Sequence, residues 1–281
     1  MKRVIYVLAV LVLLGVFCYS GWTLWDYYSD GAESQAVYDD LAALKVPVAT
    51  AAPVERPEEA PVFPTLSQEP EIPEGLVAVT HPTTGQTVWM RPEYEALFAV
   101  NPEIVGWITI EGTKVDYPVV QSSQGNTDYY LNRNFYRKKD DHGCIYAREA
   151  CDVLAPSDNI TLYGHRMNNG SMFGDLGKFK KQSFWESHRT FRFDTLYRTG
   201  TYEILAVFQT QAGTEESFRY HLFVDAESPE VFQEYIAACK ELALFDTGVG
   251  AEYGDQLLTL STCDYHKDNG RLVVVAKRIG D

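Results

Sequence analysis

The hydrophobic pattern divides the chain into three segments. Val4 to Trp25 is an almost unbroken apolar run of about 22 residues, which as a helix could cross the ~30 Å hydrocarbon core of a bilayer. Residues 47–73 hold seven of the thirteen prolines, a composition that gives an extended, semi-rigid spacer and no packed core. We therefore predict a short stub and transmembrane anchor over 1–26, a linker over 27–80 and a folded domain over 81–281.

Within the folded segment, short apolar and β-branched runs alternate with polar turns. The expected strands cover 107–110, 115–120, 143–147, 159–164, 190–193, 201–210, 256–263 and 271–279. Helical periodicity is predicted over 91–103, where Pro92 begins the helix, over 228–244 after a Ser-Pro-Glu start signal, and over 29–45 before the spacer. We therefore expect a mainly β fold with helical insertions, a closed or nearly closed barrel of about eight strands.

The charges that flank the first apolar run predict its orientation. Lys2 and Arg3 precede it and Asp26, Asp30 and Glu33 follow it, so the positive-inside rule places the N-terminus in the cytoplasm and the folded domain outside the cell. A cleaved signal peptide is the competing interpretation, because such peptides also begin with basic residues and an apolar run. The length of the run and the lack of a small-x-small cleavage site before the acidic segment favour an anchor.

The net charge of −15 argues against nucleic acid as a partner, since there is no basic stripe to neutralise phosphates. Much of this acidity lies outside the predicted domain. Eleven acidic residues fall between Asp26 and Glu74, against only Lys45 and Arg56. The charge is therefore mainly a property of a solvated linker.

Three residues in the folded segment suggest nucleophilic chemistry. The apolar run QLLTLSTC places Cys263 at the C-terminal end of a strand, and RLVVVAKRI, a second buried strand, begins with Arg271. Only seven residues separate them, so the strands can pair antiparallel and bring Arg271 near Cys263. His165 closes the earlier strand NITLYGH. A cysteine nucleophile, a proton carrier and a cation for a developing oxyanion are what attack on a carbonyl requires.

These motifs resemble the class B sortases, which carry TLxTC at a strand end, an arginine at the start of the next strand and YGH at the end of an earlier one. The likeness extends over roughly residues 88–280. It includes four segments in the expected order: NPEIVGWITIEGTKVDYPVVQ (101–121), DYYLNRNF (128–135), NITLYGHRMNNGSMFGDL (159–176) and LLTLSTCDYHKDNGRLVVVAKRI (257–279). The resemblance implies the sortase barrel, with Cys263 as nucleophile, His165 as acid and base, and Arg271 as the group that binds the carbonyl oxygen.

The resemblance also suggests substrate-binding residues. Tyr163 and Asn132 occupy places that line the groove or orient catalytic groups in class B sortases, and Ser217 and Phe218 fall in the loop that closes over the sorting signal. Two neighbours of the nucleophile, Ser261 and Thr262, are further candidates. Alternation puts Ser261 on the same strand face as Cys263, where its hydroxyl could hydrogen-bond the substrate.

The implied activity is that of a cysteine transpeptidase on the outer face of a Gram-positive cell. It would cleave a C-terminal sorting motif, Asn-Pro-x-Thr-Gly or related, and transfer the protein to an amine of a peptidoglycan precursor or a pilin lysine. No cofactor is needed for this chemistry, and the lack of H-x-x-x-H or C-x-x-C pairs gives no indication of a metal site. Pilus polymerisation or hydrolysis could use the same site. A stalked, non-catalytic surface-binding module is the alternative from a different class.

Each catalytic residue also has a simpler interpretation. Cys263 could be a packing residue, and Arg271 could pair with Asp264 or Asp268 as a structural cation. His266, on the hairpin loop, is the rival base. Of the other cysteines, Cys144 and Cys239 fit core positions, and Cys151 could form a disulfide with Cys144, which an extracellular location permits.

Overall fold

The computed structural model describes residues 2–45, 75–123, 125–126, 128–153, 155–213, 217–264 and 268–280. The proline-rich spacer over 47–73 and the rival histidine His266 lie outside these residues. The chain divides into two compact units, Met1–Asp40 and Leu41–Asp281. The second unit contains all the elements that carry the candidate chemistry.

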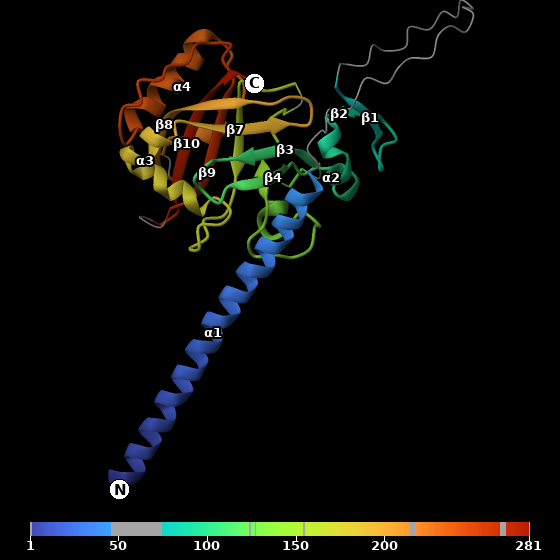
Figure 1. Ribbon diagram of the computed structural model, residues 1–281. Coiled ribbons are helices and arrows are strands. Elements are labelled where there is room, and N and C mark those ends of the chain that lie inside the picture. The colour runs from blue at the N-terminus through green and yellow to red at the C-terminus, as the bar shows by residue number, and fades with distance from the viewer. Residues whose placement is uncertain are drawn as a thin grey trace, which may run out of the picture. The chain divides into compact units, whose positions relative to one another are not determined.

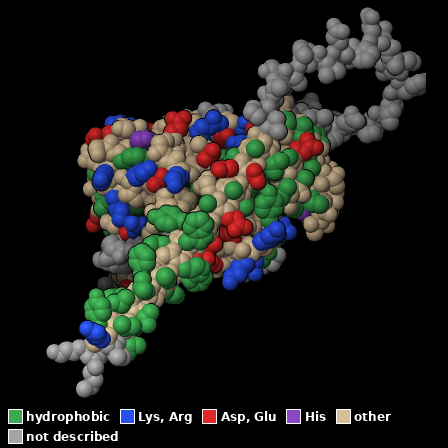
Figure 2. All heavy atoms as spheres, turned by 60° about the horizontal axis from the view of Figure 1, so that its bottom comes forward, with side chains coloured by type: hydrophobic (Ala, Val, Ile, Leu, Met, Phe, Trp, Pro, Cys, Tyr) green, Lys and Arg blue, Asp and Glu red, His purple; other side chains and the backbone are tan. Residues whose placement is uncertain are grey.

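The first unit lies in one continuous helix, α1 (Lys2–Leu44), where we expected an anchor and a separate short helix. No proline occurs before Pro47 to interrupt it, and the three glycines within it do not break it. Its stretch Ile5–Leu44 is long and apolar enough to cross a membrane by length and composition. Figure 2 shows the hydrophobic side chains gathered along this helix.

The second unit is built on a closed barrel of eight strands, which confirms the predicted fold class (Figure 1). The strands run in the order β10-β8-β7-β3-β4-β5-β6-β9 around the barrel. Their bounds are β3 (Ile104–Thr109), β4 (Asp116–Val120), β5 (Ile145–Ala147), β6 (Asn159–Tyr163), β7 (Thr190–Thr195), β8 (Thr201–Gln211), β9 (Leu257–Cys263) and β10 (Gly270–Gly280). β9 therefore lies between β6, to which it is parallel, and β10, to which it is antiparallel.

Helix α4 (Pro229–Leu242) packs against β8 on the outside of the barrel (Figure 1). Ser228 caps its first turn by accepting a hydrogen bond from the Val231 N–H, and Pro229 follows at the first helical position. One face of the helix is apolar at helical spacing and buried, namely Phe232, Tyr235, Ile236 and Cys239. This face covers the outer side of β8, β9 and β10, and it forms the wall against which the residues before α4 are packed.

Several smaller elements were not predicted. A hairpin of β1 (Val77–Thr80) and β2 (Thr87–Met90) precedes the predicted helix, which is realised as the 3₁₀ turn η1 (Pro92–Tyr94) and α2 (Glu95–Val100). The other additions are η2 (Tyr129–Asn132), η3 (Gly174–Lys180), α3 (Gln182–Ser187) and η4 (Tyr220–Leu222). Two of these short turns, η2 and η4, form walls of the candidate site.

Candidate active site

Cys263 is the last residue of β9 and the only residue of that strand that is partly exposed. The strand is buried on both faces up to this point, so it holds the cysteine rigidly at its open end. Alternation along the strand places Cys263 on the same face as Ser261 and Thr259, the face that α4 and η4 cover. The thiol therefore opens outward from the barrel wall.

Arg271 lies directly opposite Cys263 in the antiparallel pair of β9 and β10. Residues opposite each other in such a pair direct their side chains to the same face. The Arg271 Nη1 donates to the Gly270 carbonyl at 3.0 Å, which directs the guanidinium along the turn. The alternative partner Asp264 is instead bound by Arg166 and Lys180, at 2.9 Å from each.

His165 reaches the same place from the other side of β9. Tyr163 of β6 is in register with Ser261, and the Gly164 N–H donates to the Ser261 carbonyl at 3.3 Å. β6 ends at Tyr163, so His165 follows two residues after the end of this strand, whereas Cys263 is the last residue of β9. β6, β9 and β10 are neighbours in the barrel, and His165, Cys263 and Arg271 all line one pocket at this edge.

The ring of His165 is held by a main-chain carbonyl. Its Nε2 lies 2.7 Å from the carbonyl oxygen of Leu131, and because a carbonyl can only accept, Nε2 carries the proton. In this tautomer Nδ1 is the ring nitrogen with a lone pair. The Leu131 carbonyl therefore selects which nitrogen of His165 can accept a proton.

Gly143 allows this arrangement by close packing against η2. It has a positive φ of 59°, and a Cβ at this position would collide with the carbonyl oxygens of Tyr130 and Leu131. The next residue, Cys144, donates its N–H to the Tyr130 carbonyl at 3.0 Å. A glycine here therefore satisfies both the backbone conformation and the space that η2 needs.

The three residues open into one pocket with a volume of about 410 Å³. Its described lining consists of Asp128, Leu131, Tyr146, Tyr163, Gly164, His165, Ala212, Tyr220, His221, Ser261, Thr262, Cys263 and Arg271. The two rings of Tyr146 and Tyr163 lie 5.4 Å apart on β5 and β6 and form an aromatic floor. Such a pocket, apolar with a few directed polar groups, suits an extended peptide.

Burial sets the protonation of the groups around the catalytic residues. It raises the pKa of Tyr146, Tyr163 and Tyr220, so their phenols stay protonated and can donate hydrogen bonds. Burial lowers the pKa of His221, and the positive charges of Arg148, Arg219 and Arg271 lower it further. His221 is therefore kept neutral near neutral pH, and Arg271 supplies the fixed positive charge beside Cys263.

Four of the five predicted substrate-binding residues line this pocket or the next one. Ser261 shares a hydrogen bond of 2.7 Å with the Tyr220 hydroxyl, and the Thr262 hydroxyl donates to the Gly164 carbonyl at 2.8 Å. Tyr163 contributes to the aromatic floor. Asn132 is exposed and is not among the described lining residues, while its neighbour Leu131 is.

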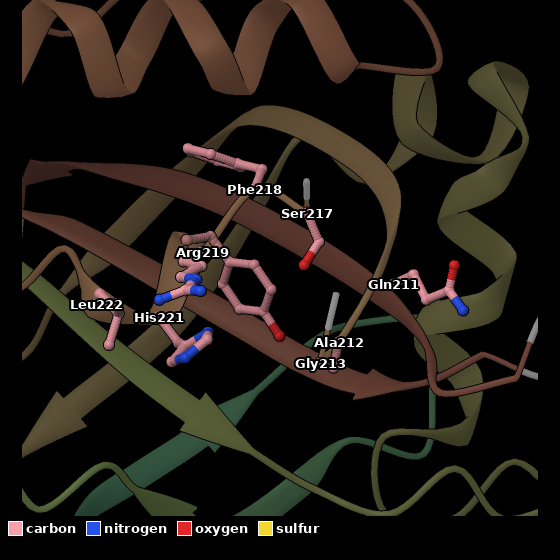
Figure 3. Close-up of a pocket in the computed structure, with 9 residues that line it drawn as sticks. Gln211, Ala212, Gly213, Ser217, Phe218, Arg219, His221 and Leu222 are labelled. Carbon is pink, nitrogen blue, oxygen red and sulfur yellow. The ribbon is translucent and has the colours of Figure 1, made fainter. Parts of the chain in front are cut away.

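Phe218, the fifth, lines a second pocket of about 320 Å³ formed by residues 211–213 and 217–222 (Figure 3). The two pockets share Ala212, Tyr220 and His221, so they form one continuous groove. In Figure 3 the Phe218 ring points toward α4, and its centroid lies 5.6 Å from that of Tyr235 in this helix. Phe218 thus fixes the loop to the barrel, whereas Ser217 faces the groove.

A buried carboxylate connects the residues that follow His165 and Cys263. Asp264 is 2 % exposed and accepts hydrogen bonds from Arg166 at 2.9 Å, from Lys180 at 2.9 Å, and from Gln209. Burial by itself would raise the pKa of Asp264, but the hydrogen bonds from Lys180 and Gln209 and the nearby charges hold this pKa below its usual value. No pattern in the sequence predicts this cluster, whose members come from four separate segments of the chain.

The other cysteines of the second unit lie away from this chemistry. Burial in the core under α4 raises the pKa of the Cys239 thiol to about 12, which makes it unreactive. Cys144 and Cys151 are separate buried thiols without a disulfide between them. Within the described residues no group of three or more His, Cys, Asp or Glu could hold a metal ion.

Known proteins are similar to this chain in sequence and in fold. Residues 108–279 match the sortase domain family. The chain is 30 % identical to sortase B of Listeria monocytogenes over 275 residues, 96 % of this chain and 94 % of the relative. The crystal structure of sortase B from Bacillus anthracis in complex with AAEK1 has a TM-score of 0.67 and 30 % identity, covering 90 % of this chain and all of that one. A Staphylococcus aureus sortase B–substrate complex has a TM-score of 0.62 and 32 % identity, and the match covers 68 % of this chain and 86 % of that one.

The chain belongs to the sortase family of cysteine transpeptidases. Its relatives place it among the class B sortases, which confirms the resemblance noted in the sequence. Sortases are cell-surface enzymes, and the apolar helix α1 is compatible with such a location.

Proposed function

We propose that this protein is a membrane-anchored sortase that cleaves a C-terminal sorting motif of secreted proteins and joins them to a cell-wall amine. The observation that carries the proposal is the pocket at the junction of β6, β9 and β10, which Cys263, His165 and Arg271 all line. An acyl transfer needs a nucleophile, a proton carrier and an oxyanion partner, and these three residues supply them.

In the first half of the reaction, the Cys263 thiolate attacks the threonine carbonyl carbon of the motif. The carbonyl oxygen gains negative charge, which the Arg271 guanidinium stabilises through directed hydrogen bonds. The threonine–glycine amide bond then breaks, and the leaving amine takes a proton from His165. The product is a thioester between threonine and Cys263.

In the second half, an amine attacks the thioester carbon and gives up a proton to His165. The carbon–sulfur bond breaks, a new amide forms and the Cys263 thiolate is restored. Because Nε2 of His165 is bonded to the Leu131 carbonyl, we assign both proton transfers to Nδ1.

The groove gives a path for the motif. Its floor is Tyr146 and Tyr163 and its outer wall is η4, with Ser261 and Tyr220 joined between them. We propose that the residues before the threonine lie along this groove, toward the pocket that Ser217 lines. A neutral motif of the Asn-Pro-x-Thr-Gly type would fit a surface of aromatic rings and hydroxyl groups.

We further propose that α1 anchors the enzyme with its N-terminus in the cytoplasm and the second unit outside. The length and apolar surface of the helix support an anchor, and the basic residues Lys2 and Arg3 support the orientation. Substrate and acceptor would then meet the enzyme at the same membrane surface.

Intact-mass spectrometry of the full chain in detergent tests the proposal. Incubation with an Asn-Pro-x-Thr-Gly peptide is expected to add the mass of the peptide up to threonine, and Cys263→Ala should abolish both the adduct and cleavage. His165→Ala should reduce turnover by about 10²–10⁴-fold. Adduct formation unaffected by Cys263→Ala would refute the assignment, and no cleavage at all would favour a non-catalytic surface module. A damaging His266→Ala with a harmless His165→Ala would identify the rival base.

The products identify the acceptor. Water gives the free acid, whereas oligoglycine, diaminopimelate or lysine gives a new amide of distinct mass. Preference for a lysine side chain of a pilin would point to polymerisation, and preference for a peptidoglycan amine would support cell-wall attachment.

A further inference from the structure

Asp128 is the one carboxylate among the described residues that line the active-site pocket. The basic groups among these lining residues are Arg271, His165 and His221, of which Arg271 is permanently positive. A negative charge in the pocket of a nucleophilic cysteine disfavours the thiolate, so its presence needs an explanation.

A structural role for Asp128 is not supported by its contacts. It precedes η2, where a capping aspartate would accept a hydrogen bond from the first turn, but its side chain makes no capping bond. Within the described part of the chain, its carboxylate is exposed and forms no hydrogen bond or ion pair. The negative charge is therefore available to a ligand.

The main chain nevertheless fixes the position of Asp128. Its N–H donates to the Asn126 side chain at 3.1 Å, and its carbonyl accepts from the Leu131 N–H at 3.1 Å. Leu131 in turn orients His165 through its own carbonyl. Asp128 and His165 are thus both hydrogen-bonded to the main chain of Leu131, Asp128 to its N–H and His165 to its carbonyl.

The two substrates of the proposed reaction differ in charge. The sorting motif is neutral around its scissile bond, whereas a primary amine acceptor is largely an ammonium ion near neutral pH, since its pKa is about 8–10. The amine must also approach His165, which takes its proton. A carboxylate on the turn that holds His165 would bind the ammonium form close to the base.

We propose that Asp128 is the acceptor-binding residue, which holds the primary ammonium group of the incoming nucleophile beside His165. The inference rests on the proposed transpeptidase function and specifies its second substrate as a cationic primary amine. Once the leaving amine has departed, the bound ammonium loses one proton to solvent, and the resulting amine attacks the thioester carbon and gives its second proton to neutral His165. The carbon–sulfur bond then breaks and Cys263 leaves as a thiolate.

The test measures how the acyl-enzyme divides between amine and water. Full-length enzyme is given the sorting peptide and triglycine, and the ratio of amide to hydrolysed product is determined by mass spectrometry. Both products come from one acyl-enzyme, so any effect of a substitution on acylation cancels. Asp128→Asn is expected to lower this ratio about fivefold, the size of an exposed charge interaction, and Asp128→Glu should largely restore it.

Hydroxylamine provides a second nucleophile that is largely uncharged at neutral pH. Its product ratio should be nearly the same in Asp128→Asn and wild type, because it gains nothing from a carboxylate. Asp141→Asn, which removes an exposed carboxylate not found among the pocket-lining residues, is the matched control and should leave both ratios unchanged.

Two outcomes overturn the inference while leaving the proposed function intact. One is an unchanged triglycine ratio in Asp128→Asn. The other is an equal fall for triglycine and hydroxylamine, which would mean that Asp128 acts on His165 through η2 and does not bind the amine. Absence of any acyl-enzyme in the wild type would instead refute the proposed function, and the inference with it.

Discussion

The Thr262 hydroxyl of β9 donates a hydrogen bond at 2.8 Å to the carbonyl of Gly164, the residue that follows the parallel strand β6, and the next residues along the two segments are Cys263 and His165. Thr262 is 2 % exposed, so this bond is shielded from water. It fixes the separation of the two strand ends at the point where the nucleophile and the base must meet. Thr262 also lines the pocket, but its hydroxyl is directed toward Gly164, where it performs this task.

Thr262→Val should therefore impair both stability and catalysis. Removing the hydroxyl leaves the buried Gly164 carbonyl without its partner, at a cost of about 1–3 kcal/mol in unfolding free energy. Turnover of the sorting peptide should fall as well, because the strand ends can separate. Thr259→Val is the matched control, since Thr259 also bonds across the same strands, to the Asn159 side chain at 2.8 Å, but lies four residues from Cys263. Equal losses of turnover in the two variants, compared by urea unfolding and peptide cleavage, would contradict this account.

Arg271→Lys should lower turnover by about 10²-fold, although the positive charge is kept. Lysine lacks the planar fork of donors that can follow the oxyanion, and loss of one such donor has this size of effect. Arg278→Lys, on the same strand but bonded to the Thr199 carbonyl, serves as the control and should retain activity. Steady-state kinetics of the two variants test whether Arg271 stabilises the oxyanion. A purely structural role for Arg271 would instead appear as a change in stability with normal turnover.

The hydrogen bond between the Tyr220 and Ser261 hydroxyls joins η4, the outer wall of the groove, to β9. Tyr220→Phe and Ser261→Ala each break this hydrogen bond of 2.7 Å, and each should raise the KM for the sorting peptide more than it lowers kcat. The double variant should lose less than the sum of the two single losses, with a coupling of about 0.5–1.5 kcal/mol. Full additivity in this double-mutant cycle would mean that the two hydroxyls act independently.

Asp264→Asn should destabilise the fold in a pH-dependent manner. Removing this buried charge leaves Arg166 and Lys180 without their partner, at a cost of about 3 kcal/mol near neutral pH. Because the pKa of Asp264 is lowered in the folded protein, its contribution is complete above the unfolded pKa of about 3.9 and is lost as pH falls through the folded value.

The stability difference between wild type and Asp264→Asn should thus be constant from about pH 5 to 8 and shrink below about pH 4. Urea unfolding over this range measures it. Asp255→Asn, which removes the partly exposed ion pair with Lys277 at 3.5 Å, should cost less than about 1 kcal/mol. A difference that persists undiminished at pH 3 would show that it does not arise from the charge of Asp264.

Truncation tests the predicted boundary of the catalytic domain. A chain beginning at Gly75 lacks Leu41, which is fully buried, and Lys45, whose amino group lies 4.9 Å from the Trp107 ring centroid. It should be less stable than a chain beginning at Asp26 by about 2 kcal/mol or more, yet cleave peptides in solution at a similar rate. In cells both should fail to display surface proteins if the anchor supplies the effective concentration. Lost peptide cleavage in the folded shorter chain would extend the catalytic unit toward α1.

The sequence could predict the barrel because its strands are short runs of β-branched and aromatic residues. The pairing of Cys263 with Arg271 followed from the short loop between them, and the resemblance to class B sortases pointed to His165 as the base. The Leu131 carbonyl and the Tyr220 hydroxyl could not be predicted in this way. They meet His165 and Ser261 across 34 and 41 residues of sequence, through contacts that depend on the tertiary fold. The 3₁₀ helix η3 and the helix α3 were not predicted, because the segment GDLGKFKKQSFWES (174–187) has no regular apolar face.

The tight packing of Gly143 against η2 shows where this active site is least tolerant of change. Gly143 carries no functional group and lies outside the described lining of the pocket, yet any side chain there would displace the carbonyl that selects the tautomer of His165. Catalysis thus constrains the residue at position 143, where glycine is required because it has no side chain. Efforts to redesign the enzyme for another substrate can vary the groove more freely than they can vary this glycine.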